Sequence, residues 1–142
     1  MDDTDRKIVA LLREDARRSY LDIGNHVHLS APAVKRRVDR LERDGVILGY
    51  TTIVDPQAFG WHAEAFVDLY CEGNITGEAI KRAVQGEPGV VSAHTVAGEA
   101  SALLHVRAED TKRLEQVLEQ IRAARGVTRT VTEVVLSTLF TR

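Results

Sequence analysis

The chain has 142 residues, of which 44% are hydrophobic and 28% charged, and its formal net charge is −2. This composition suits one medium-sized or two small globular domains, and the near-neutral charge argues against a protein that coats nucleic acid indiscriminately. No apolar run reaches membrane-spanning length and no charged-then-apolar leader opens the sequence, so we expect a cytoplasmic protein without a membrane contact.

Three short helices are predicted in the first third of the chain. Acidic residues precede the apolar positions of residues 2–12, and residues 19–22 match a capping box, so each of these segments opens a helix. Ser30 is a candidate N-cap for the third helix, Pro32 suits its first turn, and Gly45 suits a left-handed cap at its end. Short helices joined by short turns predict a helix-turn-helix.

The predicted third helix, residues 31–44, has two unlike faces. Val34, Val38 and Leu41 recur at helical spacing and form an apolar stripe that packs against the rest of the domain. Arginines project from a neighbouring side that we expect to be free of acids, which suits insertion into a major groove. The alternative is a solvated face in which acidic residues of the same helix pair with the basic ones.

The candidate contacts to double-stranded DNA gather on and around this helix. Three arginines are candidates for base edges or nearby phosphates, and Ser30 could both cap the helix and reach a phosphate. Neighbouring basic residues are candidate backbone contacts, which set register and carry no sequence information. The complete candidate set is Arg17, Arg18, Ser30, Ala33, Lys35, Arg36, Arg37 and Arg40.

A domain boundary is predicted shortly after the third helix. Residues 46–54 are β-branched and punctuated by glycine, which predicts a hairpin beside the helix, a wing. Residues 55–61 are rich in turn-forming residues and predict a linker. We therefore expect a winged helix-turn-helix domain over residues 1–54 and a second domain over residues 62–142.

The second domain has a predicted β-α-β-β-α-β order. Strands are expected at residues 63–72, 89–97, 101–106 and 127–139, with helices at residues 77–85 and between Asp110 and Gly126. This is the ferredoxin-like arrangement, an α+β fold with a four-stranded antiparallel sheet and both helices on one face. Apolar residues remain for the open face, so we expect a second copy to cover it in a dimer at least. Those residues are Val90, Val96, Leu103, Val134, Val135 and Leu136.

The turn Gly98-Glu99-Ala100-Ser101 has two interpretations. It is either a hairpin turn that needs the backbone freedom of glycine, or part of a ligand crevice in which exposed N–H groups hold a carboxylate. Thr130, Thr132 and Glu133 of the last strand could complete such a pocket, and they suit an ordinary strand equally well.

No catalytic constellation stands out, so we expect no enzyme, no catalytic residue, no metal ligand and no cofactor. A turn symmetric about Glu99 and Ala100 would place His94 opposite His105, a pair that could respond to pH or bind a metal. Two ordinary polar strand positions are the alternative.

Several motifs recur along nearly the whole chain and are specific in combination. They are Asp2-x-x-Asp5-x-x-Ile8-x-x-Leu11-Leu12, Leu29-Ser30-x-x-x-Val34-x-x-Arg37-Val38-x-x-Leu41-Glu42-x-x-Gly45-Val46-Ile47, Gly49-Tyr50, Gly98-x-x-Ser101 and Thr130-x-Thr132-x-Val134-Val135-Leu136. In this combination the chain resembles the Lrp/AsnC family of transcriptional regulators, also called feast/famine regulatory proteins.

The resemblance implies dimers, often four to an octameric ring, with a free amino acid in a crevice between subunits near a Gly-x-x-Asp turn. Here Ser101 replaces the aspartate, so the charge-assisted bond to a ligand ammonium is lost unless Glu99 supplies it. We therefore expect a sequence-specific DNA-binding regulator modulated by a small molecule, an amino acid in the first instance. The alternatives are a tetrapyrrole (siroheme-type) decarboxylase on the same architecture and an assembly scaffold without an effector.

Overall fold

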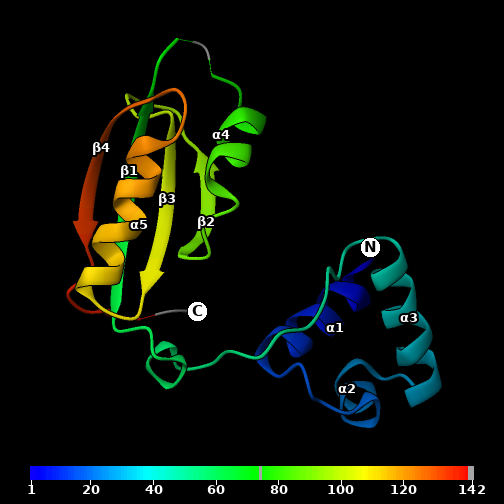
Figure 1. The fold of residues 1–142 in the computed structure, drawn as a ribbon. Coiled ribbons are helices and arrows are strands. Elements are labelled where there is room, and N and C mark those ends of the chain that lie inside the picture. Colours follow the sequence, from blue (N-terminus) through cyan, green and yellow to red (C-terminus); the bar gives the residue numbers. More distant parts are fainter. Residues whose placement is uncertain (74, 141–142) are drawn as a thin grey trace. The chain divides into compact units, whose positions relative to one another are not determined.

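The chain folds as two compact units, Met1–Ile53 and Val54–Arg142, in a computed structural model that describes residues 1–73 and 75–140 (Figure 1). The first unit contains helices α1 (Asp3–Glu14), α2 (Tyr20–Val27) and α3 (Ala31–Arg43). The second begins with a short 3-10 helix, η1 (Pro56–Phe59), and continues with β1 (Ala63–Cys71), α4 (Gly77–Val84), β2 (Val90–Thr95), β3 (Ala102–Ala108), α5 (Thr111–Ala123) and β4 (Val127–Val134). None of the helices in the described ranges is long and apolar enough to cross a membrane.

Helices α1 and α2 of the first unit begin where side chains accept hydrogen bonds from their free N–H groups. The carboxylate of Asp2 accepts a hydrogen bond from the Asp5 N–H (2.8 Å), and the carboxylate of Asp5 accepts one from the Asp2 N–H (3.0 Å). Ser19 caps α2 as predicted. Ser30 occupies the N-cap position of α3, but its hydroxyl makes no capping hydrogen bond. The Ser30 hydroxyl therefore does not stabilise the amino terminus of α3 by a capping hydrogen bond.

A tight turn at residues 28–30 joins α2 to α3 and packs against Gly24 of α2. The Gly24 position is buried, and a Cβ built there would lie 2.3 Å from the Leu29 carbonyl oxygen. His28 adopts a left-handed conformation (φ 57°) in the same turn. Glycine is therefore the residue that lets the two helices of the helix-turn-helix approach each other. The unit's core is formed mainly by Ile8, Leu12, Ile23, Val34 and Val38.

The predicted wing is wrong. Helix α3 ends at Arg43, and Gly45 follows it in the left-handed conformation (φ 69°), where the Gly45 N–H donates to the Glu42 carbonyl and the Val46 N–H to the Leu41 carbonyl. The following residues, 46–55, form no strand. The β-branched composition predicted strands, but a hairpin also needs backbone partners, and this segment finds none among the described residues. Leu48 and Ile53 are left 94% and 93% exposed.

The second unit confirms the ferredoxin-like expectation. Its antiparallel sheet has the order β2-β3-β1-β4, and α4 and α5 cover one face (Figure 1). Alternate residues of the two central strands point into the core beneath the helices. These residues are Ala63, Ala65, Val67 and Leu69 of β1 and Ala102, Leu104, Val106 and Ala108 of β3.

Strand register removes the proposed histidine pair. His94 lies opposite Leu103, and His105 lies opposite Ser92. Thr95 pairs with Ala102, so the connecting turn is centred between Gly98 and Glu99, earlier than the symmetric turn assumed from the sequence. Shifting the centre of a turn changes every cross-strand pair, so the two histidines do not face each other.

Candidate functional site

The outer side of α3 presents Arg36. This residue lies on the side of the helix opposite Val34 and Val38, which are fully buried. Arg36 is exposed, and no ion pair in the described part of the chain engages it. Ser30, six residues earlier at the N-cap, is also exposed, and its hydroxyl makes no hydrogen bond to the described residues. Among the described residues the helix therefore offers two guanidinium groups without an ion pair, Arg36 near the middle of its outward face and Arg43 at its last residue.

The expectation of an acid-free side for the other two arginines is wrong. Arg37 donates through Nη1 to Asp2 (2.7 Å) and Asp5 (2.8 Å), and Arg40 donates through Nη2 to Asp5 (2.7 Å). The helix itself carries no acid on this side, but folding brings the first turn of α1 against it. Arg37 and Arg40 thus join α3 to α1, and their role as DNA contacts remains a prediction.

Both carboxylates of this cluster are ionised over the usual pH range. The hydrogen bond from Arg37, followed by that from the Asp5 N–H, lowers the pKa of Asp2 to about 2. Burial by itself raises the pKa of Asp5, which is 0% exposed, but the hydrogen bonds from the Asp2 N–H and Arg37 outweigh it and lower the pKa. A buried carboxylate of this kind is stable only because its partners stay in place.

Two further DNA candidates also form ion pairs. Lys35 donates to Asp39 (2.6 Å) on the same helix, and this bond raises the pKa of Lys35. Arg18 pairs with Asp22 (2.9 Å) and Glu14 (3.5 Å). The Lys35 pair is exposed, so it is worth little and exchanges readily for a phosphate, whereas the Arg18 side chain is only 22% exposed. Lys35 thus pairs with an acid of its own helix, as the interpretation of a solvated charged face expects, and its role as a DNA contact remains a prediction.

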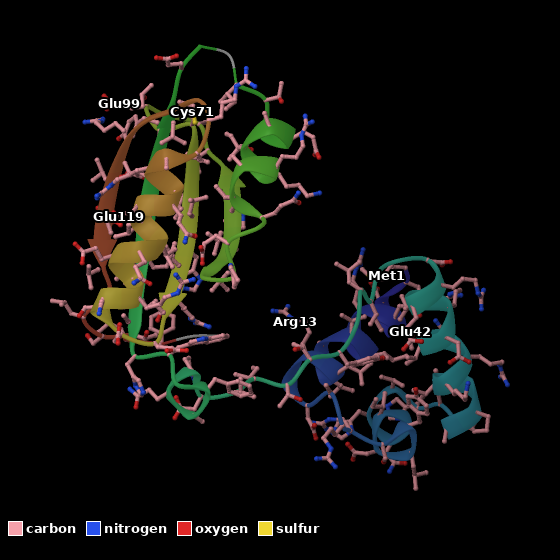
Figure 2. The ribbon with its side chains drawn as sticks, viewed as in Figure 1. Met1, Arg13, Glu42, Cys71, Glu99 and Glu119 are labelled. Carbon is pink, nitrogen blue, oxygen red and sulfur yellow. The ribbon has the colours of Figure 1, made fainter. Side chains whose placement is uncertain are left out.

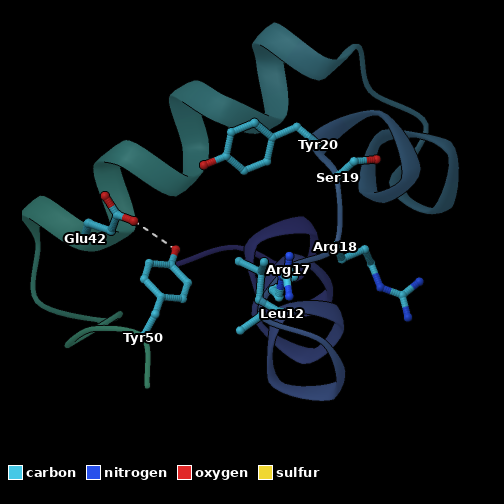
Figure 3. Close-up of a pocket in the computed structure, with 8 residues that line it drawn as sticks. Leu12, Arg17, Arg18, Ser19, Tyr20, Glu42 and Tyr50 are labelled. Atoms are coloured by element: carbon cyan, nitrogen blue, oxygen red, sulfur yellow. Dashed lines mark hydrogen bonds between the residues drawn. The ribbon is translucent and has the colours of Figure 1, made fainter. Parts of the chain in front are cut away.

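A cavity of about 330 Å³ in the first unit was not anticipated (Figure 3). It is lined by Arg17, by residues of α1 and α2, and by Tyr50, whose hydroxyl donates to Glu42 (2.8 Å). Partial burial, then this hydrogen bond, raises the pKa of Tyr50 to about 12. The Gly49-Tyr50 motif was the only sequence signal for this contact. The hydrogen bond from Tyr50 to Glu42 holds the segment after α3 against that helix.

The turn at residues 98–101 has a clear structural role. The Ser101 N–H donates to the Leu69 carbonyl (2.8 Å), and the Ser101 hydroxyl accepts from the Cys71 N–H (3.2 Å). Gly98 has a φ of 154°, as the turn interpretation requires. Glu99 lies at the same end of the sheet as Cys71 (Figure 2). Ser101 therefore extends the pairing of β1 with β3, and its own O–H remains available as a donor.

The three candidates on β4 do not share one face. Thr130 and Thr132 lie opposite the buried residues Leu69 and Val67, on the side covered by α5. Thr130 accepts a hydrogen bond from Arg122 (3.1 Å) and lines a cavity of about 330 Å³. Glu133 lies opposite Phe66 on the other face. Strand alternation separates these residues, so a single chain does not gather them into one pocket.

The open face of the sheet carries a polar cluster between apolar side chains. Glu64 accepts hydrogen bonds from His105 and Arg107, and Phe66 stacks on His105 with ring centroids 4.9 Å apart. Burial raises the pKa of Glu64, but these two hydrogen bonds outweigh it and lower the pKa. In the ranges that the structure describes, no group of His, Cys, Asp or Glu residues is placed to hold a metal ion.

The apolar residues assigned to this open face are only partly there. Val90 and Val134 pair with the buried residues Val106 and Ala65, so both lie on the helix-covered side. Leu103 lies opposite Asp68 on the open face as predicted, and exposed Phe66 and Val131 add to the apolar surface there. The open face is therefore a mixture of charged and apolar groups.

A basic helix-turn-helix followed by a ferredoxin-like unit defines a class of DNA-binding regulators with a separate ligand-binding domain. Residues 1–42 match the AsnC-type helix-turn-helix domain, and residues 64–142 match the Lrp/AsnC ligand binding domain. The chain belongs to the Lrp/AsnC family of transcriptional regulators.

Relatives and solved structures match this chain over 99–100% of its length. The chain is 50% identical over 142 residues to the HTH-type transcriptional regulator Rv2324 of Mycobacterium tuberculosis, covering 100% of this chain and 96% of that protein. The feast or famine regulatory protein Rv3291c from M. tuberculosis, complexed with L-methionine, has a TM-score of 0.91 at 34% identity, with 99% and 95% of the two chains covered. The Neisseria meningitidis regulator NMB0573, also complexed with L-methionine, has a TM-score of 0.89 at 25% identity, covering 99% and 93%.

Proposed function

We propose that this regulator recognises a specific DNA sequence through the outer face of α3, with Arg36 as its central contact. The supporting observation is that Arg36 points away from the core and carries no counter-ion in the described residues. A free guanidinium on a helix that fits the major groove can donate two hydrogen bonds to the O6 and N7 of guanine.

Other candidates take supporting roles in this proposal. The Ser30 hydroxyl and the α3 amino terminus approach a backbone phosphate, and Ala33 allows close approach. Lys35 leaves its exposed pair with Asp39 to bind a phosphate. Arg17 and Arg18 flank the same unit as backbone contacts.

We propose further that a free amino acid binds near the turn at residues 98–101 and changes DNA affinity. The methionine complexes of two relatives support this choice of ligand class. In this chain the Glu99 carboxylate is exposed and available to the ligand ammonium. The Ser101 hydroxyl oxygen already accepts a hydrogen bond from the Cys71 N–H at the end of β1.

The proposal includes a homodimer formed through the open sheet face, with octamers built from four dimers. Exposed Phe66 and Val131 on that face support an apolar contact with a second copy. In this dimer, Glu133 of one protomer and residues 98–101 of the other form the amino-acid site together, which one chain alone does not do. A decarboxylase is not proposed, because His94 and His105, which favoured it, do not face each other.

Replacing Arg36 with alanine is expected to weaken binding to the preferred duplex by about 1–3 kcal/mol, because one base-reading residue is lost. The measurement is a fluorescence-anisotropy titration of the full chain with a duplex selected from a random pool by the unmutated protein. Arg13→Ala is the matched control, because Arg13 is a surface arginine at the end of α1 and its loss leaves α3 unchanged. Equal losses for both variants would contradict the assignment of Arg36.

Binding of an amino acid at a hundred times its dissociation constant is expected to stabilise the folded protein by about 2.7 kcal/mol. A thermal-shift panel of the common amino acids measures this effect in the full chain. Glu99→Gln should abolish the shift if Glu99 holds the ammonium, whereas Glu72→Gln, a neighbouring strand-end carboxylate, should retain it. If no amino acid raises the unfolding temperature, the effector proposal is wrong, and the proposal of DNA recognition is unaffected.

A further inference from the structure

The ion-pair cluster between α1 and α3 balances its own charge. Asp2 and Asp5 contribute two carboxylates, and Arg37 and Arg40 contribute two guanidinium groups. The carboxylates come from the first turn of α1, and the guanidinium groups come from the flank of α3 beside Arg36. A flank that the sequence presents as positive is therefore nearly neutral in the folded unit.

Arg37 is held through one of its three nitrogen atoms. Its Nη1 donates to both carboxylates, and no hydrogen bond among the described residues uses Nη2 or Nε. The Arg37 side chain is 28% exposed, so part of the guanidinium still reaches the surface. Arginine bound in this way has a fixed plane and keeps donors for a further acceptor.

We propose that Asp2 and Asp5 are specificity-determining positioning residues of the DNA interface. They orient Arg37 for a single acceptor on the preferred duplex, and they cancel the charge with which Arg37 and Arg40 would bind phosphates of any sequence. This inference rests on the proposed function, since it concerns how α3 discriminates between duplexes.

Two physical effects give the cluster this role. Each phosphate neutralised by a free cation adds to binding without regard to sequence, and this contribution falls steeply with salt. A carboxylate counter-ion removes that gain, so the cationic side chain contributes only where its remaining donors meet a well-placed acceptor. A guanidinium already fixed in the free protein also loses little side-chain freedom on binding.

Asp2 offers the cleaner test because it is the more exposed carboxylate and asparagine is an equally good N-cap. Asp2→Asn should therefore keep α1 capped while it releases Arg37 from one counter-ion. Asp3→Asn is the matched control: it removes the same charge from the same helical turn, but Asp3 pairs only with Arg6 on the surface.

The experiment measures affinity of the full chain for a selected duplex and for a scrambled duplex of equal length, over a range of salt concentrations. For Asp2→Asn we expect tighter binding to the scrambled duplex and a salt slope steeper by about 0.9. The selected-to-scrambled affinity ratio should fall at least about fivefold, as for the loss of a well-oriented base contact. Asp3→Asn should leave the ratio unchanged.

A second variant tests the orientation of Arg37 without changing charge. Arg37→Lys keeps a cation but lacks the planar fork, so it should lower the ratio as Asp2→Asn does, without steepening the salt slope. An unchanged ratio in Asp2→Asn or Arg37→Lys, or an equal loss in Asp3→Asn, would overturn the inference while the proposed function stands. Failure of the unmutated protein to prefer any duplex would overturn both.

Discussion

Replacing Asp5 with alanine is expected to destabilise the Met1–Ile53 unit by about 2–3 kcal/mol, somewhat below the usual cost of breaking a buried ion pair. Asp5 is fully buried and accepts hydrogen bonds from Arg37, from Arg40 and from the Asp2 N–H. Its removal leaves both arginines short of a partner and removes half of the α1 capping box. The loss stays moderate because the Arg40 side chain is 46% exposed and can be hydrated.

Hydrogen exchange measured by mass spectrometry on the full chain can locate this loss. Amides of α1 and α3 should exchange at least about tenfold faster, since each 1.4 kcal/mol is a factor of ten. Trp61, the only tryptophan, lies in the second unit, so its fluorescence should follow the same unfolding curve as in the unmutated protein. Asp3→Ala is the control, because its side chain is 88% exposed. Equal protection in the Asp5→Ala and Asp3→Ala variants would show that the cluster does not stabilise the unit.

Replacing Gly24 with alanine is expected to destabilise the same unit by at least about 2 kcal/mol, as overpacking of a core does. Alanine is the better helix former by about 1 kcal/mol, so propensity alone predicts the opposite sign. Sterics should decide the outcome, because the added Cβ would lie 2.3 Å from the Leu29 carbonyl oxygen. The backbone of the turn must open, which moves α3 relative to α2.

Urea unfolding followed by circular dichroism at 222 nm would show a lower midpoint for Gly24→Ala, and binding to the selected duplex should weaken with it. Gly86→Ala is the control, since a Cβ there meets nothing within 4 Å. A Gly24→Ala protein as stable as the unmutated one would mean that the turn tolerates a side chain.

Helix ends were predictable because their signals are local. Asp2, Ser19 and Asp110 each accept a hydrogen bond from an N–H three residues later, so neighbouring residues contain the whole interaction. The ferredoxin-like order was equally accessible, since alternation along β1 and β3 and helical periodicity along α5 are short-range patterns.

Contacts between distant residues were not predictable in the same way. Arg37 and Asp5 are 32 positions apart, and the sequence of α3 does not indicate that carboxylates of α1 pair with its arginines. The residue that His94 faces likewise depends on the register between β2 and β3, which the turn between them sets. The wing failed for a related reason, because β-branched residues favour extended backbone but a strand forms only where a partner exists.

The amino-acid order alone indicated where the helices of both units and the strands of the sheet begin, although not that the wing is absent, and it indicated to which family the chain belongs. It could do so because these properties depend on residues within a few positions of each other. Only the tertiary structure decided which arginines on α3 are neutralised, Arg37 and Arg40, and which have no ion pair among the described residues. Ion pairs form between groups that folding brings together, so the charge that DNA meets is a property of the folded surface and not of the helix sequence.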